Sequence, residues 1–190
     1  MGTMSKLMSQ KMAQWIRVAA FMLPMAAMAG PAEDYDRGLK AYQEEDLITA
    51  LTLLRRSAED GHTPAQVLLA YILDKSEDNE QAFDLYSQAA EKGDPEGQSG
   101  LADMYSAGEG TERDLEKAVY WYSRAAESGS LRAIRILAAA FLDGGLGLEP
   151  NREKAIEWLN RGAALGDPAA QTKLRAITQD VTAEKDPKQP

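Results

Sequence analysis

One histidine and no cysteine limit the side-chain chemistry open to this 190-residue chain. A Ser–His–Asp arrangement would have to use His62, and a structural zinc site needs more Cys and His ligands than the chain has. His62 follows Gly61, where related segments carry Asp94, Ser130 and Asp167. Such residues suit the start of a helix, so we interpret His62 as a helix-capping residue and predict no catalytic residue.

Two other patterns resemble ligand-binding sites. Gly144-Gly145-Leu146-Gly147 is glycine-rich, but it lacks the G-x-G-x-x-G spacing and no Walker lysine follows. The acidic runs 44–46 and 74–80 lack the ligand order and the central glycine of an EF-hand. Gly108-Glu109-Gly110 repeats the glycine pattern at the same place in an earlier segment, so we interpret these glycines as part of the loop structure. We interpret the acidic runs as solvated loops, because runs of charge usually stay in contact with water. The sequence therefore predicts no cofactor and no metal ion.

These residues belong to a unit that occurs four times and ends each time in small residues and a glycine. The closing glycines are Gly61, Gly93, Gly129 and Gly166. Their spacings are 32, 36 and 37 residues. A period of this length is typical of stacked helical repeats, in which neighbouring units bury each other's apolar faces.

Within the units, apolar residues recur with helical spacing in two segments. Eight residues before the closing glycines lie Leu53, Leu85, Trp121 and Trp158. Eleven residues before them lie Ala50, Ala82, Ala118 and Ala155. In the segments that follow the glycines, one column holds Leu69, Leu101, Leu137 and Leu174. Large and small side chains at constant positions predict pairs of closely packed helices.

We therefore predict an all-α fold, an α-solenoid of stacked helix-turn-helix repeats within residues 30–177. The predicted repeats are 35–61, 62–93, 94–129 and 130–166, and a capping helix follows at 167–177. Residues 178–190 are polar and lack an apolar period, so we expect a disordered tail there.

Two units resemble the Sel-one-like repeat, a relative of the tetratricopeptide repeat. Residues 101–110 read L-A-x-x-Y-x-x-G-x-G, and residues 117–129 read K-A-x-x-W-Y-x-x-A-A-x-x-G. Residues 141–166 match again, with a glycine-rich loop and Trp158 in the second helix. The resemblance extends over roughly 35–177. It implies an all-α superhelix used for protein–protein contact, and it implies no shared catalytic site.

The first 29 residues differ from the rest of the chain. Lys6, Lys11 and Arg17 are their only charged residues, and an apolar run at 18–29 ends in Ala27-Met28-Ala29. This order predicts a secretory signal peptide at 1–29, with a retained amphipathic or anchor helix as the alternative. The run is shorter than the roughly 20 residues of a membrane span, so we expect no stable membrane insertion after signal cleavage.

Loss of that segment would leave an acidic chain. The whole sequence has a net charge of −9, and 18 of its 21 basic residues would remain against 30 acidic residues, a net charge of −12. Such a surface repels phosphates, so we expect no nucleic-acid partner. The lack of cysteine favours the bacterial periplasm over a disulfide-rich extracellular setting, with secretion from the cell as the alternative location.

The candidate binding residues lie in columns that vary while the neighbouring core columns stay apolar. In a solenoid of this type, one face of the first helices lines the concave surface. The hypothesised partner-binding groove consists of Val67, Tyr71, Ser99, Asp103, Arg132 and Arg135. The alternative is that these residues are unconstrained surface. Tyr120 also stands in an otherwise polar column, where we favour local packing over an exposed contact.

The sequence thus favours an exported, non-enzymatic scaffold or adaptor that binds a protein or peptide partner. Regulation of an envelope process is one role that the resemblance implies. The alternatives are a hydrolase directed at cell-wall or β-lactam substrates and a secreted effector. No signal places two carboxylates together for hydrolysis, and the relatives linked to such activity are cysteine-rich.

Overall fold

The computed structural model describes residues 30–185, with side chains through Gln179, and this part of the chain contains helices but no strand. The α-helices are α2 (Pro31–Gln43), α3 (Leu47–Glu59), α4 (Thr63–Lys75), α5 (Asn79–Glu91), α6 (Pro95–Ala107), α7 (Leu115–Glu127), α8 (Leu131–Asp143), α9 (Arg152–Ala164) and α10 (Pro168–Lys185). A 3-10 turn, η1 (Gly145–Gly147), precedes α9. The predicted signal peptide lies outside the described residues.

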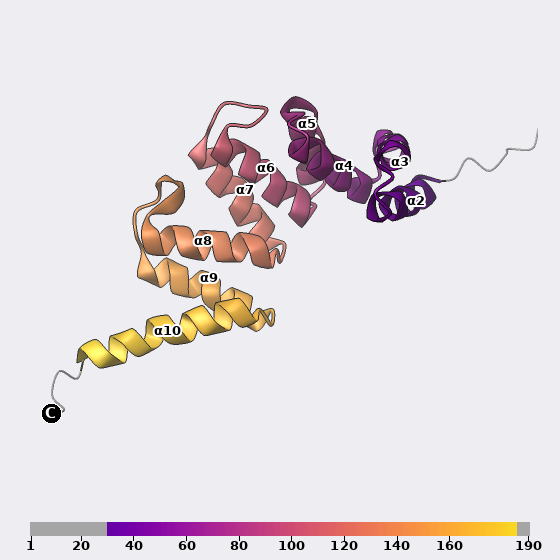
Figure 1. Ribbon diagram of the computed structural model, residues 1–190. Coiled ribbons are helices and arrows are strands. Elements are labelled where there is room, and N and C mark those ends of the chain that lie inside the picture. The colour runs from indigo at the N-terminus through magenta and orange to yellow at the C-terminus, as the bar shows by residue number, and fades with distance from the viewer. Residues whose placement is uncertain (1–29, 186–190) are drawn as a thin grey trace, which may run out of the picture.

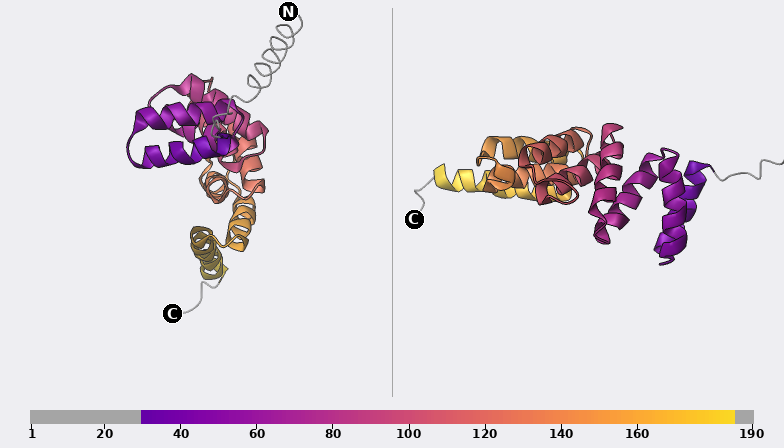
Figure 2. Two further views of the ribbon diagram at one scale, coloured as in Figure 1. Left: turned by 90° about the vertical axis from the view of Figure 1, so that its right-hand side faces the viewer. Right: turned by 90° about the horizontal axis from the view of Figure 1, so that it is seen from above.

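The helices form antiparallel pairs that stack in chain order. Each helix packs mainly against the helices before and after it. Figure 1 shows the pairs following one another in a curved row, with α2 and α10 at its two ends, and the two further views agree (Figure 2). The prediction of an all-α solenoid is confirmed.

The core is a row of clusters rather than one centre. One cluster joins α3 to α6, a second joins α6 to α8, and a third lies between α8, α9 and α10. The predicted alanine column is fully buried: Ala50, Ala82, Ala118 and Ala155 are each 0% exposed. Small residues there allow the paired helices to approach closely, while Leu69, Leu101 and Leu137 fill the space beside them.

The turns between pairs depend on the closing glycines. Gly61, Gly93, Gly129 and Gly166 have φ angles between +82° and +94°. Side chains disfavour this left-handed region, which explains why the repeat ends in glycine.

Most helices after these turns begin with a side-chain cap, but α4 does not. Asp94 and Ser130 accept hydrogen bonds from the backbone N–H of Gly97 and Ala133. His62 occupies the equivalent position, but its side chain accepts no such bond. The predicted place of His62 at the start of a helix is confirmed, but its side chain does not cap that helix. Its ring packs instead against Tyr35, with 5.0 Å between the ring centroids.

The start of the first predicted repeat and the end of the predicted solenoid need correction. The first helix begins at Pro31, before the predicted start of the first repeat at Tyr35, because proline is well suited to the first helical position. The last helix continues past Ile177 to Lys185, so the predicted tail begins too early. Because no proline or glycine stands between Pro168 and Pro187, the helix continues there although the segment lacks an apolar period.

Candidate functional site

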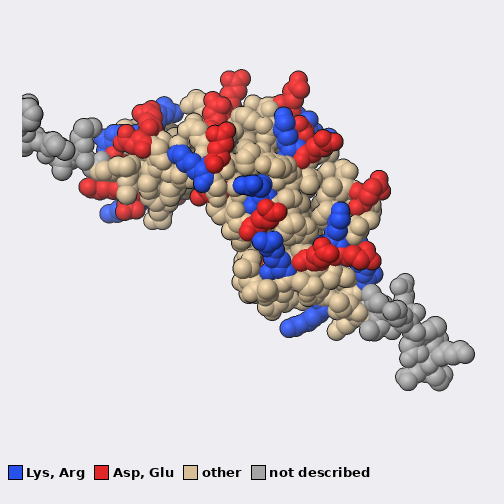
Figure 3. Space-filling view, turned by 180° about the vertical axis from the view of Figure 1, so that it is seen from behind, with Lys and Arg blue, Asp and Glu red and all other residues tan. Residues whose placement is uncertain are grey.

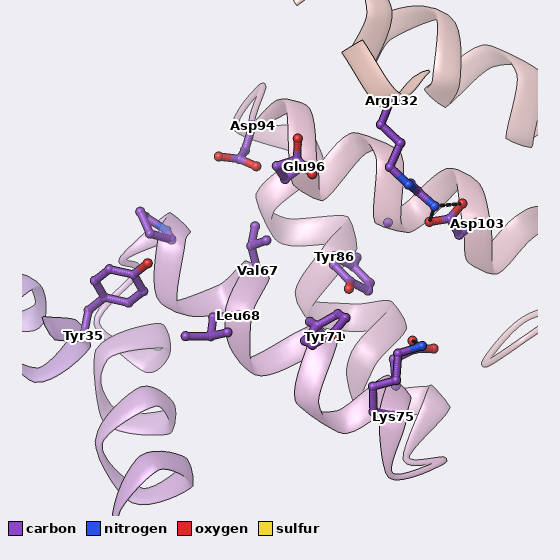
Figure 4. A pocket seen from close by; sticks show the side chains of 13 residues that line it. Tyr35, Val67, Leu68, Tyr71, Lys75, Tyr86, Asp94, Glu96, Asp103 and Arg132 are labelled. Atoms are coloured by element: carbon purple, nitrogen blue, oxygen red, sulfur yellow. Dashed lines mark hydrogen bonds and ion pairs between the residues drawn. The ribbon is translucent and has the colours of Figure 1, made fainter. Parts of the chain in front are cut away.

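A cavity of about 570 Å³ opens between the first helices of the pairs and is here called the α4–α6 cavity. Its walls come from α2, α4, α5, α6 and α8 (Figure 4). The residues that line it are Tyr35, Pro64, Val67, Leu68, Tyr71, Asp74, Lys75, Tyr86, Asp94, Glu96, Gly100, Asp103 and Arg132. The cavity therefore combines aromatic and aliphatic surface with charged groups.

The floor of the α4–α6 cavity is formed by Tyr86 where α5 meets α6. A Cβ atom at Gly100 would lie 2.4 Å from the Tyr86 ring, so only glycine permits this close contact. Tyr86 is 7% exposed, and burial, with a smaller effect from the charges of Asp74 and Asp103, raises its pKa. The phenol therefore stays neutral at physiological pH. Tyr71, which is 43% exposed, lies beside it in Figure 4.

A hydrogen-bonded cluster holds one wall of the cavity together. Asp103 of α6 accepts a hydrogen bond from the Tyr122 hydroxyl of α7 and pairs with Arg132 of α8, with 2.7 Å between Nη2 and Oδ2. Burial and the bond to Asp103 raise the pKa of Tyr122. Partial burial alone would lower the pKa of Arg132, but the attraction of Asp103, its hydrogen bond and nearby Glu96 raise it overall. The cluster fixes three helices around charges that face the cavity.

A second pair of charges lies at the end of α4. The Lys75 ammonium lies 3.5 Å from the Asp74 carboxylate and 5.6 Å from the centroid of the Tyr71 ring. Lys75 thus covers part of an aromatic surface that would otherwise be more exposed.

A smaller cavity of about 250 Å³ lies beyond α8 and is here called the α8–α10 cavity. Its lining residues are Arg135, Ala138, Ala139, Leu142, Leu159, Ala169, Ala170 and Lys173. One nitrogen of Arg135 lies 3.4 Å from Asp167 Oδ1. The other oxygen, Asp167 Oδ2, is buried without a hydrogen-bond partner among the described residues.

The structure brings four of the six hypothesised groove residues together. Val67, Tyr71, Asp103 and Arg132 line the α4–α6 cavity, and Arg135 lines the α8–α10 cavity. The hypothesis was wrong for Ser99, because this residue is 1% exposed and cannot contact a partner. Its hydroxyl lies 3.2 Å from that of Ser130, at the start of α8, which covers this turn of α6.

Sequence reasoning missed several residues of the α4–α6 cavity, including Tyr35, Leu68, Lys75 and Glu96. For Tyr86 a signal was present. Tyr86 stands seven residues before a closing glycine. The same position holds Tyr122 in the next unit and leucine in the first and last units. A tyrosine in a buried leucine column indicates a hydroxyl directed to a polar edge.

Tyr120 differs from our expectation of local packing. Its side chain is 53% exposed, although its ring lies edge-on to that of Trp121 with 5.1 Å between centroids. It lines neither of the two cavities.

Within residues 30–185, no group of three His, Cys, Asp or Glu side chains could hold a metal ion. None of the helices in the same range is long and apolar enough to cross a membrane. Figure 3 shows acidic and basic side chains interspersed along the back of the molecule, without a broad field of one sign.

The repeat units match the model of the Sel1 repeat at residues 25–62, 63–94, 95–130 and 132–167. The chain belongs to the Sel1 repeat family. Sel1 repeat proteins are protein-interaction scaffolds, and their fold is generally non-enzymatic. Repeats of this family imply protein partners.

Solved structures of Sel1 repeat proteins have the same architecture. A Sel1 repeat protein from Oxalobacter formigenes is 30% identical, with a TM-score of 0.66 over 72% of this chain and 58% of that one. The protective antigen c5321 of uropathogenic Escherichia coli is 29% identical, with a TM-score of 0.70 over 79% of this chain and 34% of that one.

One curated relative is known as a component of a larger assembly. HRD3A of Arabidopsis thaliana, a component of the ERAD-associated E3 ubiquitin-protein ligase, is 33% identical over 122 residues. The match covers 55% of this chain and 18% of HRD3A. The chain thus spans about a fifth of the length of that relative.

Proposed function

We propose that this Sel1 repeat chain is an exported, non-enzymatic scaffold that holds an extended segment of a partner protein in the α4–α6 cavity. The observation that carries the proposal is the open aromatic surface around Tyr71, bordered by the charged residues Asp103 and Arg132. Aromatic rings bury much area at little cost in side-chain entropy, which makes them effective anchors in interfaces.

The walls of the cavity are held in place by their own contacts. Asp103 is bound by Tyr122 and Arg132, and Lys75 is held against Asp74 and Tyr71. A partner therefore meets a surface that needs little ordering on binding, which favours affinity. The role of HRD3A as a component of a ligase assembly supports a scaffold function for the repeat.

The binding proposal is tested by capture of partners from the native cell with wild type, Tyr71→Ala and Tyr120→Ala. Both tyrosines are about half exposed, but only Tyr71 lines the cavity. We expect a partner that Tyr71→Ala loses and Tyr120→Ala retains, with the loss confirmed on purified proteins. Capture that is equal with all three proteins would contradict the proposal.

Export to the bacterial periplasm rests on the basic, apolar and small-residue order of residues 1–29. We expect the protein from the native cell to begin at Gly30 and to appear in the periplasmic fraction. Mass spectrometry of the intact protein checks the first point, and cell fractionation checks the second. An uncleaved protein in the cytoplasmic fraction would refute export but would leave the binding proposal in place.

A further inference from the structure

Both cavities adjoin helix α8, and together they are here called the groove. Arg132 borders the α4–α6 cavity, and Arg135 borders the α8–α10 cavity. Residues three apart lie on the same face of a helix, so both cavities adjoin a single face of α8. An extended segment that leaves the first cavity across this face reaches the second.

The α4–α6 cavity carries an excess of negative charge. Four carboxylates and two cations line it. The cations are already paired, Lys75 with Asp74 and Arg132 with Asp103. Asp94 caps α6, and the exposed Glu96 forms no ion pair with another described residue. This end of the groove therefore favours a positively charged occupant.

The α8–α10 cavity has the opposite sign. Arg135 and Lys173 line it without any acidic residue. Asp167 beside Arg135 offsets one of the two charges, and the exposed Lys173 has no ion pair within the described residues. The remaining walls are alanine and leucine side chains. This end favours an occupant with a carboxylate next to apolar groups.

We propose that the groove binds an extended peptide segment in one direction, with a Lys or Arg beside an apolar anchor over α4–α6 and a carboxylate over α8–α10. The proposal rests on the proposed function and adds the chemistry and direction of the partner segment. Tyr35 and Tyr71, with the aliphatic residues beside them, offer contact surface to the stem and cation of a basic side chain. Opposite charges at the two ends fix orientation more than affinity.

The probe is a random peptide library displayed on phage, with peptides of about twelve residues, which in extended form are long enough to cross several helices. Selection against the purified protein should enrich peptides with a basic residue beside an aromatic or aliphatic residue. An acidic residue or free carboxyl terminus should follow on a constant side. Selected peptides are then synthesised, and their affinities are measured by calorimetry.

Glu96→Lys tests the acidic end. We expect selected peptides to bind this variant at least about fivefold more weakly, and a peptide whose basic residue is replaced by Glu to regain affinity for it. Glu116→Lys is the matched control, because Glu116 is also an exposed second residue of its helix and lines neither cavity. It should bind like wild type.

Lys173→Glu tests the basic end. We expect a similar loss, recovered when the acidic residue of the peptide is replaced by Lys. Arg175→Glu is the control on the same helix, since residues two apart point to opposite sides and Arg175 lines neither cavity.

The outcomes separate this proposal from the function on which it rests. Peptides that bind wild type, lose affinity for Tyr71→Ala and ignore both charge reversals would overturn the proposed direction and leave the groove function standing. Peptides that bind Tyr71→Ala as well as wild type, or a selection without enrichment, would count against both.

Discussion

At the scale of single residues, small side chains set the distance between neighbouring helices and so shape the groove. A Cβ atom at Gly97 would lie 2.5 Å from the Ala89 Cβ and 3.0 Å from the Ala89 carbonyl carbon. Part of this obstacle is backbone, which cannot rotate away as a long side chain can. The position of α6 against α5, and with it one wall of the α4–α6 cavity, therefore depends on a missing methyl group.

Gly97→Ala is expected to lower the free energy of unfolding by about 1–3 kcal/mol, because overpacking outweighs the better helix propensity of alanine. Urea unfolding followed by circular dichroism measures the change. Gly145→Ala is the control, since the nearest atom to its Cβ would be at an ordinary contact distance of 3.4 Å. Unchanged stability of Gly97→Ala would show that α6 can move away from α5 at little cost.

At the scale of helices, an ion pair between the buried Asp34 and the partly exposed Arg56 joins α2 to α3 at the start of the row. Asp34 is 0% exposed and accepts hydrogen bonds from two nitrogens of Arg56. The hydrogen bonds and charge of Arg56 hold the pKa of Asp34 below its ordinary value of 3.8, although burial opposes this. Because the pKa of Asp34 is lower in the folded protein than in the unfolded chain, its ionised form stabilises the folded protein at pH values above the ordinary pKa. That contribution is lost as the pH falls through the pKa of the folded state.

Asp34→Asn is therefore expected to lower the melting temperature at pH 7, with a difference from wild type that shrinks as the pH falls below about 4. Melting curves between neutral and acidic pH test this. Asp36→Asn, at an exposed neighbouring position, should change little. A difference between wild type and Asp34→Asn that stays constant over this pH range would mean that the ionised pair does not cause the effect.

The sequence predicted helix pairs well because the signals for them are local. A closing glycine such as Gly93 marks a turn, and a buried alanine such as Ala82 marks a close contact between two helices. Ser99 could not be placed in this way, since its burial depends on Ser130 in the next pair, 31 residues later. His62 likewise occupies the predicted position at a helix start, but its ring contacts Tyr35 of the preceding pair.

The candidate site was predicted in part for the same reason. Tyr71 and Asp103 follow from the column pattern of the first helices. Tyr86 belongs to a second helix, and it reaches the cavity only because Gly100 of α6 leaves space for its ring. Contacts between helices of different units carry no signal in the spacing of one unit, so they required the structure.

At the scale of the molecule, contacts between neighbours should make stability a local property. The clusters of the core follow one another along the row, and each helix packs chiefly on its neighbours in the chain. Repeat proteins built in this way have stabilities that approximate sums over units and their interfaces.

Leu137→Ala tests this expectation, because Leu137 is 0% exposed in the second cluster. We expect a loss of about 2–5 kcal/mol, with faster hydrogen exchange in α7 and α8, whose residues make up most of this cluster, and little change in α2 and α3. Hydrogen-exchange mass spectrometry resolves the helices. An equal increase along the whole chain would indicate one cooperative unit instead of a row of units.

Site-specific photocrosslinking shows whether a partner lies in the α4–α6 cavity. A photoreactive phenylalanine replaces either Tyr71, inside the cavity, or Tyr120, a comparably exposed tyrosine outside it. We expect the probe at position 71 to crosslink one identified protein in native cells and the probe at position 120 not to do so. Equal crosslinking at both positions, or crosslinking only at position 120, would mean that the partner does not lie in the α4–α6 cavity.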